Sequence, residues 1–144
     1  VNKDGVNVYA IDPHDAYIDV SDVNPNYKQS YAAFDMAVFL ENIVTHNAHY
    51  KIFPVALSSN EVVWERPIGL LFIDGAHDYY SVLDDFDNFN TSIVRGGYLI
   101  FHDSEWSGPK QVIKEIQETY KDVYTLLEVV DSLTIFRKNG AEYD

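Results

Sequence analysis

The sequence contains no cysteine, so neither a disulfide nor a thiolate metal site is possible within its 144 residues. It is also poor in basic residues, because 10 Lys and Arg stand against 23 Asp and Glu and the formal net charge is -13. Nucleic-acid backbones and anionic membrane surfaces are bound through cationic patches, which argues against both as partners. No apolar run approaches the roughly 18 residues of a membrane-spanning helix. We therefore expect a soluble, cytoplasmic protein that acts on a small molecule.

Glycine is scarce as well: the chain has seven, and none of them forms the GxGxxG pattern of a dinucleotide-binding turn. Apolar residues, in contrast, are abundant, because 47% of the chain is hydrophobic and 15% is aromatic. That composition can fill one core, and no linker, repeat or low-complexity segment divides the sequence. We therefore expect a single domain over residues 1–144.

Residues 70–103 contain two apolar runs joined by an amphipathic helical pattern, and the runs stop at Asp74 and at His102-Asp103. A strand, a helix and a second strand in this order form a βαβ unit, whose strands lie parallel. Ligands of parallel sheets bind beyond the carboxyl ends of the strands. Asp74, His77, His102 and Asp103 are therefore expected to share one rim of the sheet.

The same alternation of strands and helices runs through the chain. Strand-like runs occupy residues 6–11, 50–56, 69–73, 97–101, 123–130 and 132–137, and helical patterns occupy residues 30–46, 82–93 and 109–120. This order predicts an α/β fold: a Rossmann-like three-layer sandwich with a mostly parallel sheet and an antiparallel hairpin at its C-terminal edge.

Three motifs carry a resemblance to a known family. IDPH at 11–14, LLFIDGAHDYYSVLDDF at 70–86 and RGGYLIFHDS at 95–104 resemble class I S-adenosylmethionine-dependent methyltransferases. They are most similar to the branch that carries IDGxHxY followed by GGxIxxHD, and the likeness covers residues 6–137. The resemblance implies S-adenosylmethionine as cofactor, methyl transfer to a hydroxyl of a small molecule or sugar, and a homo-oligomer as one form of assembly. Relatives of this kind work with or without Mg²⁺ or another divalent cation.

The resemblance also implies roles for individual residues. It assigns the cofactor to Asp12, His14, Leu57, Ser58 and Asp74, a divalent cation to Asp74, His102 and Asp103, and the general base to His77 or His102. Asp12 would hold the ribose hydroxyls, because one carboxylate accepts two hydrogen bonds at once. A turn cap is the structural alternative for Asp12, and the tight Asp74-Gly75 turn is a structural alternative for Asp74.

The chain departs from the family in one place, because the glycine-rich first strand that normally cradles the methionine part of the cofactor, and its helix, are missing. Either the chain is cut from a longer protein, which we favour, or the strand and cofactor binding were lost together. Two other functions stay open: a metal-dependent hydrolase built on the rim residues, and a non-catalytic domain for assembly with an open sheet edge at 6–11. The methyltransferase interpretation requires Asp12, Asp74 and Asp103 to meet at one mouth.

Overall fold

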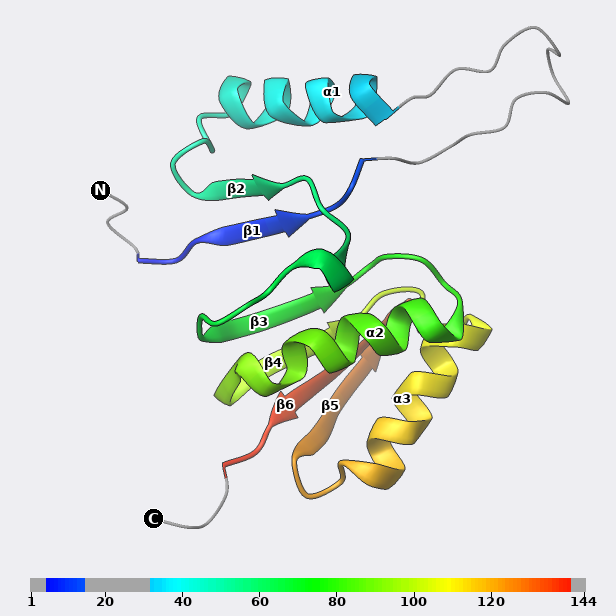
Figure 1. The fold of residues 1–144 in the computed structure, drawn as a ribbon. Coiled ribbons are helices and arrows are strands. Elements are labelled where there is room, and N and C mark those ends of the chain that lie inside the picture. Colours follow the sequence, from blue (N-terminus) through cyan, green and yellow to red (C-terminus); the bar gives the residue numbers. More distant parts are fainter. Residues whose placement is uncertain (1–4, 15–31, 141–144) are drawn as a thin grey trace, which may run out of the picture. The chain divides into compact units, whose positions relative to one another are not determined.

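The computed structural model describes residues 5–14 and 32–140. The chain divides after Val62 into two compact units, and each is described here by itself (Figure 1).

The first unit is a short parallel sheet with one helix. Strand β1 (Val8–Ile11) pairs in parallel with β2 (Ile52–Val55), and helix α1 (Ala32–Thr45) lies between them in the sequence. Parallel neighbours need such a crossover, because a tight turn can only join antiparallel strands. Asn47 ends the helix with a left-handed φ of 53°, a conformation that Asn tolerates at this position.

The second unit holds a four-stranded sheet in the order β3-β4-β6-β5. Its elements are β3 (Ile68–Ile73), α2 (Tyr79–Phe89), β4 (Ile93–Phe101), α3 (Ser107–Thr119), β5 (Tyr124–Val130) and β6 (Leu133–Lys138). Strands β3 and β4 are parallel, whereas β6 runs antiparallel to both β4 and β5. The carboxyl ends of β3 and β4 therefore lie side by side at one edge (Figure 1).

The core of the second unit lies on one face of this sheet. Side chains alternate between the two faces along each strand, so one set of strand residues points at the helices α2 and α3. That set and its helical partners are less than 9% exposed: Ile73, Val82, Phe86, Ile93, Leu99, Phe101, Val112, Ile113, Ile116, Tyr124 and Phe136. On the opposite face Leu70, Phe72 and Tyr98 are 55%, 46% and 41% exposed.

The predicted Rossmann-like α/β fold with an antiparallel C-terminal hairpin is confirmed. The helix predicted over residues 82–93 is wrong at its end, because it stops at Phe89 and Ile93 opens β4. The Asn90 side chain explains the stop: its amide donates to the carbonyl oxygens of Phe86 and Asp87, at 3.0 and 3.2 Å, and so satisfies the last turn. Among the described residues, no helix is long and apolar enough to cross a membrane.

Candidate functional site

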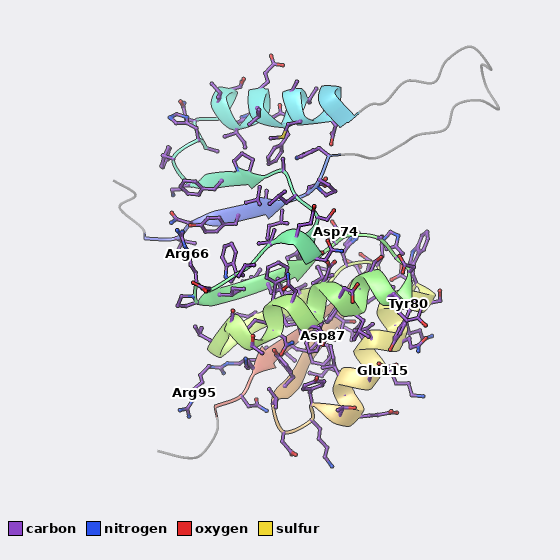
Figure 2. The ribbon with its side chains drawn as sticks, in the orientation of Figure 1. Arg66, Asp74, Tyr80, Asp87, Arg95 and Glu115 are labelled. Carbon is purple, nitrogen blue, oxygen red and sulfur yellow. The ribbon has the colours of Figure 1, made fainter. Side chains whose placement is uncertain are left out.

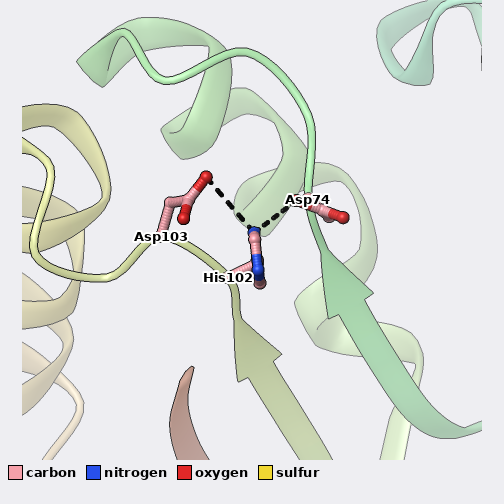
Figure 3. Close-up of side chains that lie close together, drawn as sticks. All are labelled: Asp74, His102 and Asp103. Carbon is pink, nitrogen blue, oxygen red and sulfur yellow. Dashed lines mark ion pairs between the residues drawn. The ribbon is translucent and has the colours of Figure 1, made fainter. Parts of the chain in front are cut away.

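The ends of β3 and β4 bring together the predicted rim residues of the second unit. Asp74 directly follows β3, and the His102 amide donates a hydrogen bond to the Ile73 carbonyl oxygen, at 3.0 Å. This bond extends the ladder by one step and places the two strand ends against each other. Figure 2 labels Asp74 at the end of β3, and Figure 3 shows it beside His102 and Asp103.

His102 lies between two carboxylates. Its Nδ1 atom is 2.8 Å from Asp74 Oδ1 and 3.3 Å from Asp103 Oδ2 (Figure 3). Both distances are those of ion pairs, so two carboxylate oxygens share this one buried nitrogen. One ligand atom from each of the three side chains lies within 4.8 Å of the other two. One imidazole nitrogen and two carboxylate oxygens this close together fit a metal ligand set.

His77 reaches the same cluster from the loop after β3. Its Nε2 atom is 3.0 Å from Asp103 Oδ2, and its ring lies 4.6 Å from the Trp106 ring, centroid to centroid. Both imidazoles are about one-third exposed, at 35%. Asp103 itself adopts a left-handed φ of 45°, a strained conformation that is most often found at functional sites.

Backbone contacts hold the two loops of the cluster together. A Cβ atom on Gly108 would lie 2.2 Å from the His77 carbonyl oxygen, so glycine is required where α3 begins against the β3–α2 loop. Asp78 caps α2 by accepting a hydrogen bond from the Ser81 amide, at 3.1 Å. Hydrogen bonds from the Ser81 side chain and amide lower the pKa of the Asp78 carboxyl. Farther along, the hydrogen bond that Tyr79 Oη donates to Glu115 of α3 raises the pKa of Tyr79.

The hollow among the cluster residues is too narrow to hold a ligand. It is lined by the strand ends, the β3–α2 loop and the start of α3, and it leaves no volume that a water molecule could enter. A ligand of this cluster must therefore bind from the solvent side, where the imidazoles and Asp74 are accessible.

The first unit holds the other four predicted residues. Asp12 follows β1 with a 61% exposed side chain, and its Oδ1 atom accepts a hydrogen bond from the His14 amide, at 2.6 Å. The His14 side chain is only 9% exposed, and its Nδ1 atom is hydrogen-bonded to Asp35 Oδ2 at 2.8 Å. Leu57 is 44% exposed in the segment after β2. The amide of the next residue, Ser58, donates to Glu61 Oε2 at 2.9 Å.

The structure therefore brings together Asp74, His77, His102 and Asp103, as the strand ends predicted. Asp12 belongs to the other unit, so its place at the same mouth stays a prediction. The sequence did not identify Asp35 as the partner of His14. Its position in the first turn of α1 was the available signal, since acidic residues favour a helix N-terminus.

Known sequences agree with this fold. The sequence model of a methyltransferase domain family matches residues 1–104, which contain all the candidate residues named above. A curated relative, the uncharacterized protein R132 of Acanthamoeba polyphaga mimivirus, is 27% identical over 126 residues. That match covers 85% of this chain and 52% of the viral protein, so the chain spans about half the length of this relative.

Solved structures share the fold at low sequence identity. The O-methyltransferase NovP has a TM-score of 0.62 at 16% identity, over 93% of this chain and 60% of NovP. An rRNA methylase from Streptococcus thermophilus has a TM-score of 0.61 at 13% identity, over 93% and 74%. A third, SMU.1697c from Streptococcus mutans in complex with SAH, has a TM-score of 0.59 at 14% identity, over 92% and 76%. With the family match over residues 1–104, the chain belongs to this methyltransferase domain family, and it has the fold of these solved methyltransferases.

Proposed function

We propose that the cluster of Asp74, His77, His102 and Asp103 is the catalytic centre of an S-adenosylmethionine-dependent O-methyltransferase that a divalent cation assists. The observation that carries the proposal is the convergence of Asp74, His102 and Asp103, whose ligand atoms lie within 4.8 Å of one another at the ends of two parallel strands. Both carboxylates approach the same nitrogen, His102 Nδ1, at 2.8 and 3.3 Å.

The donor atoms indicate which cation fits. Asp74, His102 and Asp103 would supply two carboxylate oxygens and one imidazole nitrogen. Carboxylates suit Mg²⁺ and Mn²⁺, whereas imidazole suits transition metals, so this mixed set favours Mn²⁺ over Mg²⁺. Such an ion, when bound, lowers the pKa of a neighbouring hydroxyl and so favours its deprotonation.

An imidazole of the cluster would act as the general base that removes the acceptor hydroxyl proton. Methyl transfer forms a bond between the acceptor oxygen and the methyl carbon and breaks the methyl–sulfur bond, whose electron pair stays on sulfur. The hydroxyl proton must leave, and the neutral nitrogen of an imidazole can accept it. We assign this role to His77, which Asp103 orients at 3.0 Å. His102 is the alternative base if no cation binds, since its ring nitrogen is then not occupied by a metal.

The cofactor contacts are proposed residue by residue. Asp12 would accept hydrogen bonds from the ribose hydroxyls with the lone pairs that the His14 amide leaves unused. Leu57 and Ser58 would meet the adenine, and Asp74 would lie nearest the methyl donor. His14 is committed to Asp35, so its contribution is to fix the turn that presents Asp12.

The acceptor class is argued from charge. A net charge of -13 disfavours the polyanionic backbone of RNA, so we assign a small molecule as the acceptor, although an rRNA methylase shares the fold. Fold alone does not choose the acceptor of a methyltransferase.

Calorimetric titration with S-adenosylhomocysteine, in the presence and absence of Mn²⁺, tests the proposal. We expect the chain to bind the ligand, and Asp12→Ala to weaken binding by about 1–3 kcal/mol through lost charged hydrogen bonds. Glu118→Ala is the matched control, because it removes an exposed carboxylate of α3 whose ion pair is with Lys114. Mn²⁺ binding without heat from S-adenosylhomocysteine, in a longer form of the protein that includes a glycine-rich first strand, would contradict methyl transfer and favour a metal-dependent hydrolase.

A further inference from the structure

Trp106 is an exposed aromatic side chain at the edge of the candidate centre. It is 54% exposed, and its indole packs against the His77 ring at 4.6 Å with an interplanar angle of 33°. His77 also contacts the cluster, because its Nε2 atom is 3.0 Å from Asp103 Oδ2. One imidazole therefore separates the indole from a candidate metal ligand.

Hydrogen bonds hold the main chain of Trp106 in place. The Trp106 amide donates to the Asp103 carbonyl oxygen, at 2.9 Å, and the Trp106 carbonyl oxygen accepts from the Lys110 amide, also at 2.9 Å. Gly108, two residues later, permits the close approach of α3 to the His77 backbone. Substrate-binding groups need this kind of support, because a loosely held side chain gives little orientation.

Trp106 also occupies a position where helix stability would select another residue. It is the N-cap of α3 with extended angles, φ -70° and ψ 151°, and it makes no capping hydrogen bond with its side chain. Ser, Thr, Asp and Asn are preferred at an N-cap because their side chains satisfy the free amides of the first turn. Burial does not explain the choice either, since a packing tryptophan would be largely covered.

We propose that Trp106 is the platform on which the ring of the methyl acceptor stacks, with the acceptor hydroxyl directed at Asp74, His102 and Asp103. The proposal rests on the proposed function and deepens it by naming the acceptor: a ring that carries hydroxyl groups. The hollow among the cluster residues is too narrow for a ring, so the acceptor must bind at the surface, where the indole is exposed. Phenols stack on an indole through their π faces, and sugars pack on it through their C–H faces.

The two tryptophans of the chain make the test direct. Trp64 packs edge-on against Phe89, and its Nε1 atom donates to the Arg66 carbonyl oxygen at 2.7 Å. Trp64→Phe leaves Trp106 as the sole indole, whose fluorescence is followed during titration with catechol or with methyl β-glucoside. Both titrations are made with saturating Mn²⁺ and S-adenosylhomocysteine. We expect a saturable change with one of the two rings, and which ring it is distinguishes a phenolic acceptor from a sugar.

Calorimetry with the responding ring then tests the platform in the otherwise unaltered chain. We expect Trp106→Ala to weaken ring binding at least tenfold, Trp106→Phe to retain most of it, and Tyr98→Ala, an exposed aromatic on the other sheet face, to leave it unchanged. Trp106→Ser keeps the test valid if the alanine variant fails to fold, because serine is a preferred N-cap and also lacks the ring.

Two results would overturn the platform. One is no fluorescence response to either ring while S-adenosylhomocysteine still binds, and the other is equal ring binding by Trp106→Ala and the unaltered chain. Either leaves methyl transfer standing. Failure of the unaltered chain to bind S-adenosylhomocysteine would instead remove the proposed function, and the platform with it.

Discussion

Each of the two units holds a histidine between two carboxylates, but only one of these histidines is satisfied. His14 is almost covered, its Nδ1 atom is hydrogen-bonded to Asp35 at 2.8 Å, and its ring packs beside Phe39. His102 is 35% exposed and its Nδ1 atom, at the same distance from Asp74, makes no hydrogen bond. The same residue types thus form a closed structural pair in one unit and an open donor set in the other.

The difference separates stabilising from ligand-binding clusters. The covered pair of His14 and Asp35 gains from its hydrogen bond, whereas the rim cluster is partly exposed and offers three ligand atoms to a cation from solvent. A short distance between a carboxylate and an imidazole does not by itself indicate a reactive site. The exposure and the hydrogen bonds of the two groups are needed as well. Three experiments, taken from the largest expected effect to the smallest, probe this contrast.

Replacing one carboxylate in each unit should separate the two clusters most clearly. At a Mn²⁺ concentration 100 times its Kd, we expect the free energy of unfolding of the unaltered chain to rise by about 2.7 kcal/mol. Asp103→Asn should abolish this gain, and asparagine is chosen because it tolerates the left-handed φ of 45°. Asp35→Asn, the matched change in the first unit, should keep it. Urea unfolding with and without Mn²⁺ measures both, and equal loss in the two variants would end the distinction.

The open cluster also depends on a close backbone approach. Gly108→Ala places a Cβ atom 2.2 Å from the His77 carbonyl oxygen and should lower the free energy of unfolding by about 1–3 kcal/mol through overpacking. It should weaken Mn²⁺ binding as well, because α3 and the loop that carries His77 must separate. Gly69→Ala in β3 is the control, since no atom lies within 4 Å of its Cβ position. Normal stability of Gly108→Ala would show that this approach does not hold the site.

Removing the two imidazoles should have unequal effects on stability in the absence of metal. His14→Asn breaks the hydrogen bond to Asp35 and should lower the free energy of unfolding by about 1 kcal/mol. Asparagine again suits the backbone, because His14 has a φ of 51°. His102→Asn should lower the free energy of unfolding by less, about 0.5 kcal/mol, because it removes ion pairs of a partly exposed imidazole. Urea titrations without added metal would contradict the contrast if His102→Asn proved the more destabilising change.

Much of the second unit could be predicted from local sequence pattern. Apolar runs that stop at Asp74 and at His102 define two strands, and a βαβ crossover makes these strands neighbours, so the meeting of the two side chains follows from topology. The start of β4 was mispredicted because Ile93 continues the helical spacing of Val82 and Phe86. The Asn90 bonds that end the helix are a three-dimensional detail.

The contacts of the individual histidines could not be predicted from the spacing of residues in the sequence. The pairing of His14 with Asp35 joins residues 21 positions apart, and the stacking of Trp106 on His77 depends on how α3 docks. Such contacts are fixed by tertiary packing, which local periodicity does not encode. Whether a buried nitrogen finds a hydrogen bond is likewise decided by angles that only coordinates supply.

Anomalous diffraction from a crystal of the chain grown with Mn²⁺ tests the central claim most directly. We predict one strong manganese peak within bonding distance of Asp74, His102 and Asp103, and no peak at His14 and Asp35. A peak at the His14 pair, or an empty position among the three rim residues at saturating Mn²⁺, would contradict the account.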